Sequence, residues 1–150
     1  MRLISHRGNV SGPNLENENK PSFIQTAIDE GYDVEVDVRL LDAGLYLGHD
    51  NPDYPVELEW LVARKDRLWI HTKNFQAMNL LIEHDLKVFY HQTEKHAVIG
   101  NTRFIWSCDL TEATERSVIP LIGEEETEKY KDVIMNFYAV CSDYIRRFAP

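Results

Sequence analysis

The sequence predicts an α/β fold in which a parallel sheet or barrel carries helices on its outer side. Three features of the chain support this. Apolar segments with strand character alternate with helical segments along the 150 residues. Hydrophobic residues make up 43% of the chain and charged residues 27%, as in ordinary globular domains. No repeat or linker-like segment interrupts the pattern, so residues 1–150 are predicted to form one domain.

The first repeating unit is a strand, a polar loop and a helix. Leu3-Ile4-Ser5 is a short apolar strand, and residues 9–20 are mostly polar. Pro21 suits the first turn of a helix and Gly31 suits its end. Between them apolar residues recur at helical spacing, at Phe23, Ile24, Ala27 and Ile28.

The second unit is an acidic strand that leads into a hairpin. In residues 32–40, valines alternate with other residues at the period of a strand. The valines therefore face one side, and Glu35 and Asp37 face the other. A turn at residues 42–44 and a short apolar run at residues 45–48 predict a hairpin that ends at His49-Asp50.

The rest of the chain continues the alternation. Helices are predicted over residues 56–65, 75–84 and 125–137, and strands over residues 68–73, 87–91, 103–107, 117–121 and 139–144. Pro52 and Pro55 predict an irregular segment after the hairpin. With the first two strands, this gives about seven strands and a hairpin.

Charge and composition disfavour several classes of protein. The formal net charge of −9 argues against a nucleic-acid-binding protein, which normally presents a basic surface to phosphates. No stretch approaches the roughly 20 apolar residues of a membrane span. Residues 1–5 leave no room for a signal peptide, so a cytoplasmic location is expected.

Three short segments at predicted strand ends carry groups that act on phosphates. They are His6-Arg7-Gly8, Glu35-Val36-Asp37 and His49-Asp50. His6 and His49 are a natural acid and base pair, because imidazole titrates near neutral pH, and which of them is the base stays open. Arg7 can hold phosphate oxygens or pair with a carboxylate. Glu35 and Asp37 repel each other on one strand face, which a divalent metal would relieve.

Taken in order, these segments resemble the glycerophosphodiester phosphodiesterase family, part of the phospholipase-C-like phosphodiesterases. The resemblance covers about the first third of the chain and rests on His6-Arg7-Gly8, Glu18-Asn19, residues 31–38, Asp42-Ala43-Gly44 and Gly48-His49-Asp50. It implies a TIM-type (β/α) barrel, a divalent metal and hydrolysis of a phosphodiester. The expected fold is thus an abbreviated TIM-type barrel of about seven strands, with a hairpin after the second strand.

The third strand of the expected site departs from the family pattern. Where the family usually carries Glu-x-Lys, this chain has His71-Thr72-Lys73. As a metal ligand, His71 would move the preference from Mg²⁺ or Ca²⁺ toward Mn²⁺ or Zn²⁺; the alternative is a hydrogen-bonded core histidine. Lys73 is predicted to bind the phosphate. His91 closes an apolar strand and could reach the mouth of the site, but a position without a functional role is favoured.

The chain is short for such a barrel, which normally takes about 250 residues. Either the barrel is trimmed and incompletely ringed, with a second copy of the chain covering it in a homo-oligomer, or the strand count is wrong. Shortened loops would leave an open cleft, which favours an exposed or bulky phosphodiester.

The leading hypothesis is a metal-dependent phosphodiesterase that acts on a small, glycerophosphodiester-like substrate. The metal is assigned to Glu35, Asp37 and His71, proton transfer to His6 and His49, and phosphate binding to Arg7 and Lys73. The attacking oxygen belongs to water or to a hydroxyl of the substrate. The alternative is a degenerate barrel that binds a phosphorylated lipid or sugar without turnover. A third hypothesis, an amide-cleaving metallohydrolase, is disfavoured because it requires an H-x-H pair on the first strand, which this chain lacks.

Overall fold

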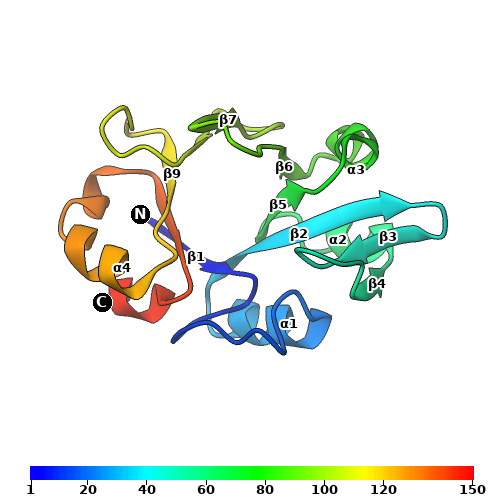
Figure 1. Ribbon diagram of the computed structural model, residues 1–150, viewed down its shortest axis with the longest axis horizontal. Coiled ribbons are helices and arrows are strands. Elements are labelled where there is room, and N and C mark those ends of the chain that lie inside the picture. The colour runs from blue at the N-terminus through cyan, green and yellow to red at the C-terminus, as the bar shows by residue number, and fades with distance from the viewer.

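In the computed structural model, which describes residues 1–150, ten strands form one curled mixed sheet (Figure 1). They are β1 (Arg2–His6), β2 (Asp33–Leu41), β3 (Gly44–Leu47), β4 (Tyr54–Val56), β5 (Leu68–Thr72), β6 (Lys87–Phe89), β7 (His96–Val98), β8 (Ile105–Ser107), β9 (Ser117–Pro120) and β10 (Ala139–Ser142). Seven of them pair in parallel, in the order β6-β5-β2-β1-β10-β9-β8. β3 and β4 extend β2 as an antiparallel meander, and β7 lies antiparallel to β8.

The predicted TIM-type barrel is wrong, because no regular ring of helices surrounds the sheet. The helices are α1 (Pro21–Asp29), α2 (Leu58–Val62), α3 (Phe75–Leu81) and α4 (Glu124–Tyr130), with short 3-10 helices η1 (Ile82–His84), η2 (Ile134–Asn136) and η3 (Ile145–Phe148). No helix lies between β6 and β9, and Figure 1 shows the sheet bare around β7. A single isolated bridge, between Val88 and Gly100, links β6 to the residues that follow β7. The fold is a curled half-barrel.

The connections explain why the helical ring is missing. A TIM barrel follows every strand with a helix that buries an apolar stripe on the sheet. Residues 90–95 and 99–104 are too few to form such a helix and return to the sheet. Residues 108–116 are longer, but Leu110 is their only large aliphatic residue, so they have no apolar stripe. The alternation of strands and helices therefore stops after β6.

Smaller differences follow from local chemistry. The segment with Pro52 and Pro55 is partly regular, because Pro55 lies in β4 at the edge of the sheet, where its missing N–H is tolerated. β7 was not predicted, and its three residues are too short to show alternation. The helix predicted over residues 125–137 is divided into α4 and η2.

The two faces of the sheet bury different cores. The outer face of β2, β3 and β5 packs on α1, α2 and α3, in a cluster that includes Ile24, Val36, Leu61 and Ile70. The inner face of the curl holds a second cluster with Ile4, Trp69, Phe89, Trp106, Val118 and Cys141. A third cluster lies between β9, β10 and the C-terminal helices, around Ile119, Val140 and Ile134. The valines of β2 therefore point outward, and its acids point into the curl.

The parallel register fixes which polar residues become neighbours. His6, the last residue of β1, lies beside Glu35 of β2. Two residues further along β2, Asp37 lies beside His71 of β5. Because these strands are parallel, the four side chains emerge at the same end of the curl, above the apolar inner cluster.

Gly48 directly follows β3 and leads the chain out of the sheet to His49. Its φ is +144°, and a Cβ at this position would lie 2.0 Å from the carbonyl oxygen of Asn51 and 2.8 Å from a carboxylate oxygen of Asp53. A side chain is therefore excluded here both by the backbone conformation and by the folded turn.

We expect Gly48→Ala to lower the free energy of unfolding by about 3 kcal/mol, because the Cβ must displace backbone as well as strain φ. Gly44→Ala is the matched control, since Gly44 also has a positive φ of +132° but open space at the Cβ position. It should cost only about 1 kcal/mol. Urea denaturation of both variants measures the difference; equal losses would contradict the proposed clash.

Candidate active site

A cavity of about 360 Å³ opens at the ends of β1, β2 and β5 where their polar residues emerge. Its lining includes His6, Arg7, Glu35, His49, His71 and His91. A smaller recess of about 240 Å³ is lined by His49, His71 and His91 as well, and also by Lys73. The structure thus brings together the residues that the sequence placed in one site, with Asp37 fully buried behind them.

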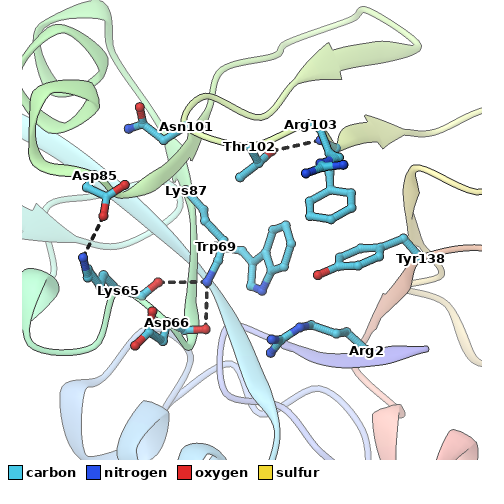
Figure 2. A pocket seen from close by; sticks show the side chains of 11 residues that line it. Arg2, Lys65, Asp66, Trp69, Asp85, Lys87, Asn101, Thr102, Arg103 and Tyr138 are labelled. Atoms are coloured by element: carbon cyan, nitrogen blue, oxygen red, sulfur yellow. Dashed lines mark hydrogen bonds and ion pairs between the residues drawn. The ribbon is translucent and has the colours of Figure 1, made fainter.

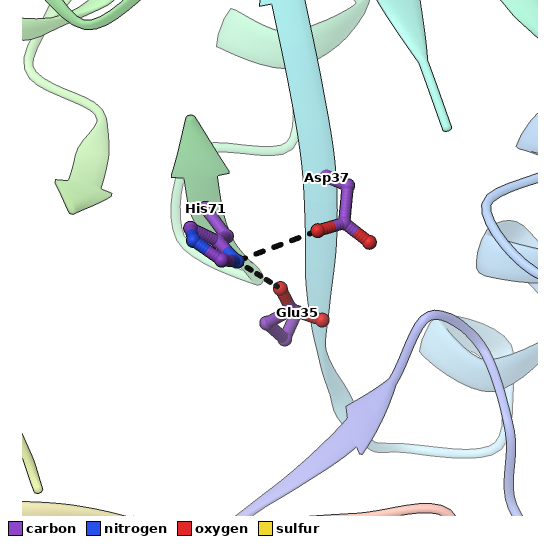
Figure 3. A group of neighbouring side chains, drawn as sticks. All are labelled: Glu35, Asp37 and His71. Carbon is purple, nitrogen blue, oxygen red and sulfur yellow. Dashed lines mark ion pairs between the residues drawn. The ribbon is translucent and has the colours of Figure 1, made fainter. Parts of the chain in front are cut away.

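Glu35, Asp37 and His71 form a compact group that could hold a metal ion (Figure 3). One ligand atom from each residue lies within 4.8 Å of the others. His71 Nδ1 is 3.4 Å from Asp37 Oδ1 and 3.9 Å from Glu35 Oε1. Figure 3 shows the imidazole of β5 pointing toward both carboxylates of β2.

The hydrogen bonds around this group leave acceptor atoms unused. Glu35 Oε2 and Asp37 Oδ1 are buried without a hydrogen-bond partner. His71 Nε2 lies 3.2 Å from the carbonyl oxygen of His91, which can only accept, so Nε2 carries a proton. Nδ1 then faces the two carboxylates. Asp37 Oδ1 and Glu35 Oε1 both face His71 Nδ1, so a cation bound among these three atoms would satisfy Asp37 Oδ1, and unsatisfied buried oxygens are costly. The donor set of two carboxylates and one imidazole therefore fits a divalent metal.

The two carboxylates have opposite electrostatic environments. Burial favours the neutral form of Glu35, and the charge of Asp37 adds to this, so the pKa of Glu35 is raised. Burial also opposes the charged form of Asp37, but His71, Arg7 and Lys73 outweigh it and hold the pKa of Asp37 well below its usual range. Asp37 is thus the fixed negative charge of the site, and Glu35 is the carboxylate that lacks compensation.

Asp37 is held by groups from two segments, the loop after β1 and the end of β5. Arg7 Nε lies 2.8 Å from Oδ2, and Lys73 Nζ lies 3.5 Å from Oδ1. The Asn19 side chain donates to Oδ2 at 2.9 Å and accepts from the Asp37 backbone N–H at 2.9 Å. Arg7 also donates to Glu18 at 3.1 Å. Of the two roles that the sequence left open for Arg7, the structure shows pairing with carboxylates; phosphate binding stays a prediction.

His6 is oriented by a residue that sequence reasoning did not assign to the site. Its Nδ1 lies 2.7 Å from Asp143 Oδ1, and its Nε2 lies 3.8 Å from Glu35 Oε2. Burial disfavours the charged imidazole, but the hydrogen bond with Asp143 and the charge of Glu35 outweigh it and raise the pKa of His6. Asp143 also accepts from Asn9 at 2.8 Å. Local pattern gives no signal for this contact, because Asp143 follows β10 and meets His6 only through the pairing of β1 with β10.

His49 lies at the mouth of the cavity. Its side chain is 42% exposed, and its Nδ1 is 2.7 Å from Asp50 Oδ1. Arg39 donates to the carbonyl oxygens of Gly48 and His49 and so holds the turn that carries the imidazole. His6 and His49 therefore line the same cavity from different depths, one buried and one open to solvent.

His91 lines both recesses, which is the position at the mouth of the site that the sequence left as the less favoured alternative. It follows β6, two residues after Phe89, and its ring is stacked on His71 with centroids 4.7 Å apart. Partial burial lowers the pKa of His91, and the neighbouring His71 and Lys73 add to this effect. The alternation Phe89, Tyr90, His91 could have placed it on the inner face.

A larger cavity of about 630 Å³ lies at the other end of the parallel strands (Figure 2). It contains none of the predicted site residues, and most of its charged groups already have partners. Lys65 pairs with Asp85 at 2.7 Å, and Arg2 with the buried Asp33 at 3.0 Å. Lys87 donates to two backbone carbonyls at 2.8 Å. Most of the charged side chains in this cavity are therefore already used in structural contacts.

Comparison with known proteins adds no assignment. No family model, no curated protein and no solved structure matches the chain. The resemblance to glycerophosphodiester phosphodiesterases therefore rests on the sequence segments given above. Among the helices of the structure, none is both long and apolar enough to cross a membrane.

We expect Asn19→Ala to lower the free energy of unfolding by about 2–3 kcal/mol, because it leaves the buried Asp37 amide and carboxylate without their partner. Asn17→Ala is the matched control, since the Asn17 side chain makes only an exposed hydrogen bond to Asn14. It should change stability by less than about 0.5 kcal/mol. Chemical denaturation checks both; equal effects would show that Asn19 contributes nothing specific to the site.

Proposed function

We propose that this protein is a metal-dependent phosphodiesterase of the glycerophosphodiester phosphodiesterase type. The observation that carries the proposal is the group of Glu35, Asp37 and His71, whose possible ligand atoms converge and of which Asp37 Oδ1 has no hydrogen-bond partner. His6, Arg7 and His49 line the cavity beside this group, and Lys73 contacts Asp37. Two imidazoles, two cations and a carboxylate pair are the groups that metal-assisted cleavage of a phosphodiester requires.

Glu35, Asp37 and His71 would hold the metal. When bound, it would polarise a phosphoryl oxygen and neutralise charge that develops during cleavage. The carboxylate oxygens suit Mg²⁺ or Ca²⁺, and the imidazole nitrogen favours Mn²⁺ or Zn²⁺. Asp37 is already fixed by Asn19 and Arg7, so the chain supplies one preoriented ligand before any ion binds.

Proton transfer is assigned to the two histidines. Asp143 contacts His6 Nδ1, which leaves Nε2 directed toward Glu35 and the cavity. In this orientation Nε2 can accept or donate a proton at a substrate oxygen, while Asp143 holds the ring. His49, exposed at the mouth, is the partner for the oxygen on the opposite side of the phosphate.

The two cations of the site differ in what they can do for the substrate. Lys73 keeps a rather long contact of 3.5 Å with Asp37, so its ammonium can reorient toward a phosphate oxygen. Arg7 is held more firmly, by Glu18 and Asp37. Lys73 is therefore the principal phosphate-binding residue, and Arg7 chiefly keeps Asp37 ionised and in place.

We expect Mn²⁺ to bind the wild-type protein and to raise its melting temperature, because binding to the folded state alone stabilises it. Glu35→Gln removes a charged ligand and should weaken binding at least tenfold, measured by isothermal titration calorimetry. Glu59→Gln, on the exposed surface of α2, is the matched control and should bind as the wild type does. If the wild-type protein binds none of Mg²⁺, Ca²⁺, Mn²⁺ and Zn²⁺, the metal site is excluded.

We expect release of nitrophenol from bis-(p-nitrophenyl) phosphate in the presence of the preferred metal. His6→Ala should lower the rate roughly 100-fold or more, because general acid–base catalysis contributes that much. Asp143→Asn should lower it less, since the imidazole remains. His96→Ala, in the exposed pair with Glu112, is the control. Undiminished activity in His6→Ala would refute the catalytic assignment, and metal binding without turnover would favour a non-catalytic phosphate-binding protein.

A further inference from the structure

His71, the proposed metal ligand that departs from the family pattern, is packed against a row of aromatic rings. The His71 ring is stacked on Phe89, with centroids 5.0 Å apart and planes 7° apart, and on His91, at 4.7 Å and 9°. Phe89 is stacked in turn on Trp106 at 4.4 Å. Phe89 and Trp106 belong to the buried inner cluster of the curl, so this part of the stack is anchored in the core.

The ring of His91 and the main chain of His91 contact different parts of His71. The carbonyl oxygen of His91 lies 3.2 Å from Nε2 of His71 and can only accept, so this Nε2 carries a proton. The ring of His91 covers part of the imidazole face and opposes rotation about the Cβ–Cγ bond. Together the two contacts leave Nδ1 directed at Asp37 and Glu35.

Metal binding by an imidazole depends on the orientation of the ligand more than binding by a carboxylate does, because the imidazole nitrogen offers a single lone pair in the plane of its ring. Asp37 is fixed by Asn19, Arg7 and Lys73, whereas His71 Nδ1 has no fixed partner except the two carboxylates. Loss of a residue that fixes the orientation of a metal ligand commonly lowers the metal affinity 10- to 100-fold.

We propose, on the premise of the metal site proposed above, that His91 is a positioning residue for His71. Its ring, stacked on the imidazole, holds Nδ1 toward Glu35 and Asp37 and thereby strengthens the binding of a metal that accepts nitrogen, such as Mn²⁺ or Zn²⁺. His91 does not itself contact the ion, since the convergent group consists of Glu35, Asp37 and His71 alone.

The test compares Mn²⁺ affinity by isothermal titration calorimetry in His91→Gln and His91→Phe. His91→Gln removes the ring and should weaken binding roughly 10- to 100-fold. His91→Phe keeps an aromatic ring of similar width and should stay within about threefold of the wild type. His84→Ala, on η1 away from the cavity, is the control. Melting temperatures in EDTA show whether either variant is merely less stable.

The outcomes separate the two proposals. Wild-type affinity in His91→Gln overturns the positioning role and leaves the proposed function standing. Equal weakening in His91→Gln and His91→Phe also overturns it, because the imidazole itself would then contact the ion. A wild-type protein that binds no Mn²⁺ or Zn²⁺ overturns the proposed function, and this inference with it.

Discussion

The structure of the site depends on keeping the carboxylate of Asp37 ionised while it is fully buried. Without partners at that depth, the carboxyl would take up a proton instead of staying charged. The Asp37 carboxylate is contacted by Arg7 and Asn19 from the loop after β1 and by Lys73 from the end of β5. Because these groups converge on one carboxylate, the loop, β2 and β5 are held in a single arrangement. The charge of the neighbouring Glu35 is offset less, and its pKa is raised.

The strands near the N-terminus were predictable from local pattern, and the closure of the sheet was not. The alternation in β2 identifies the buried valines and the inward-facing acids from sequence alone. Whether a parallel sheet closes into a barrel depends on every connection, and alternation in the first half says nothing about residues 90–116. Strands of three residues, such as β7, leave too little periodicity to detect.

The site, like the fold, was only partly predictable from the sequence. His6, Glu35, Asp37 and His71 could be grouped in advance, because parallel strands bring their ends to one edge. Asp143 could not be given a role from local pattern, since it is 137 positions from His6 and meets it only through the pairing of β1 with β10. For His91, the alternation after Phe89 indicates the inner face but gives the histidine no role there. Its significance comes from stacking on His71, which only the tertiary structure shows.

The absence of helices between β6 and β9 divides the molecule into a thick side and a thin side. On the thick side, the amides of β2 and β5 lie between two apolar layers, so solvent reaches them only when much of the protein opens. On the thin side, β7 is an edge strand with Val98 largely exposed and few contacts on its outer face. We therefore expect backbone amides there to exchange with solvent through small local openings, at free energies well below that of global unfolding. The most rigid part of the chain is thus the part that carries the carboxylates.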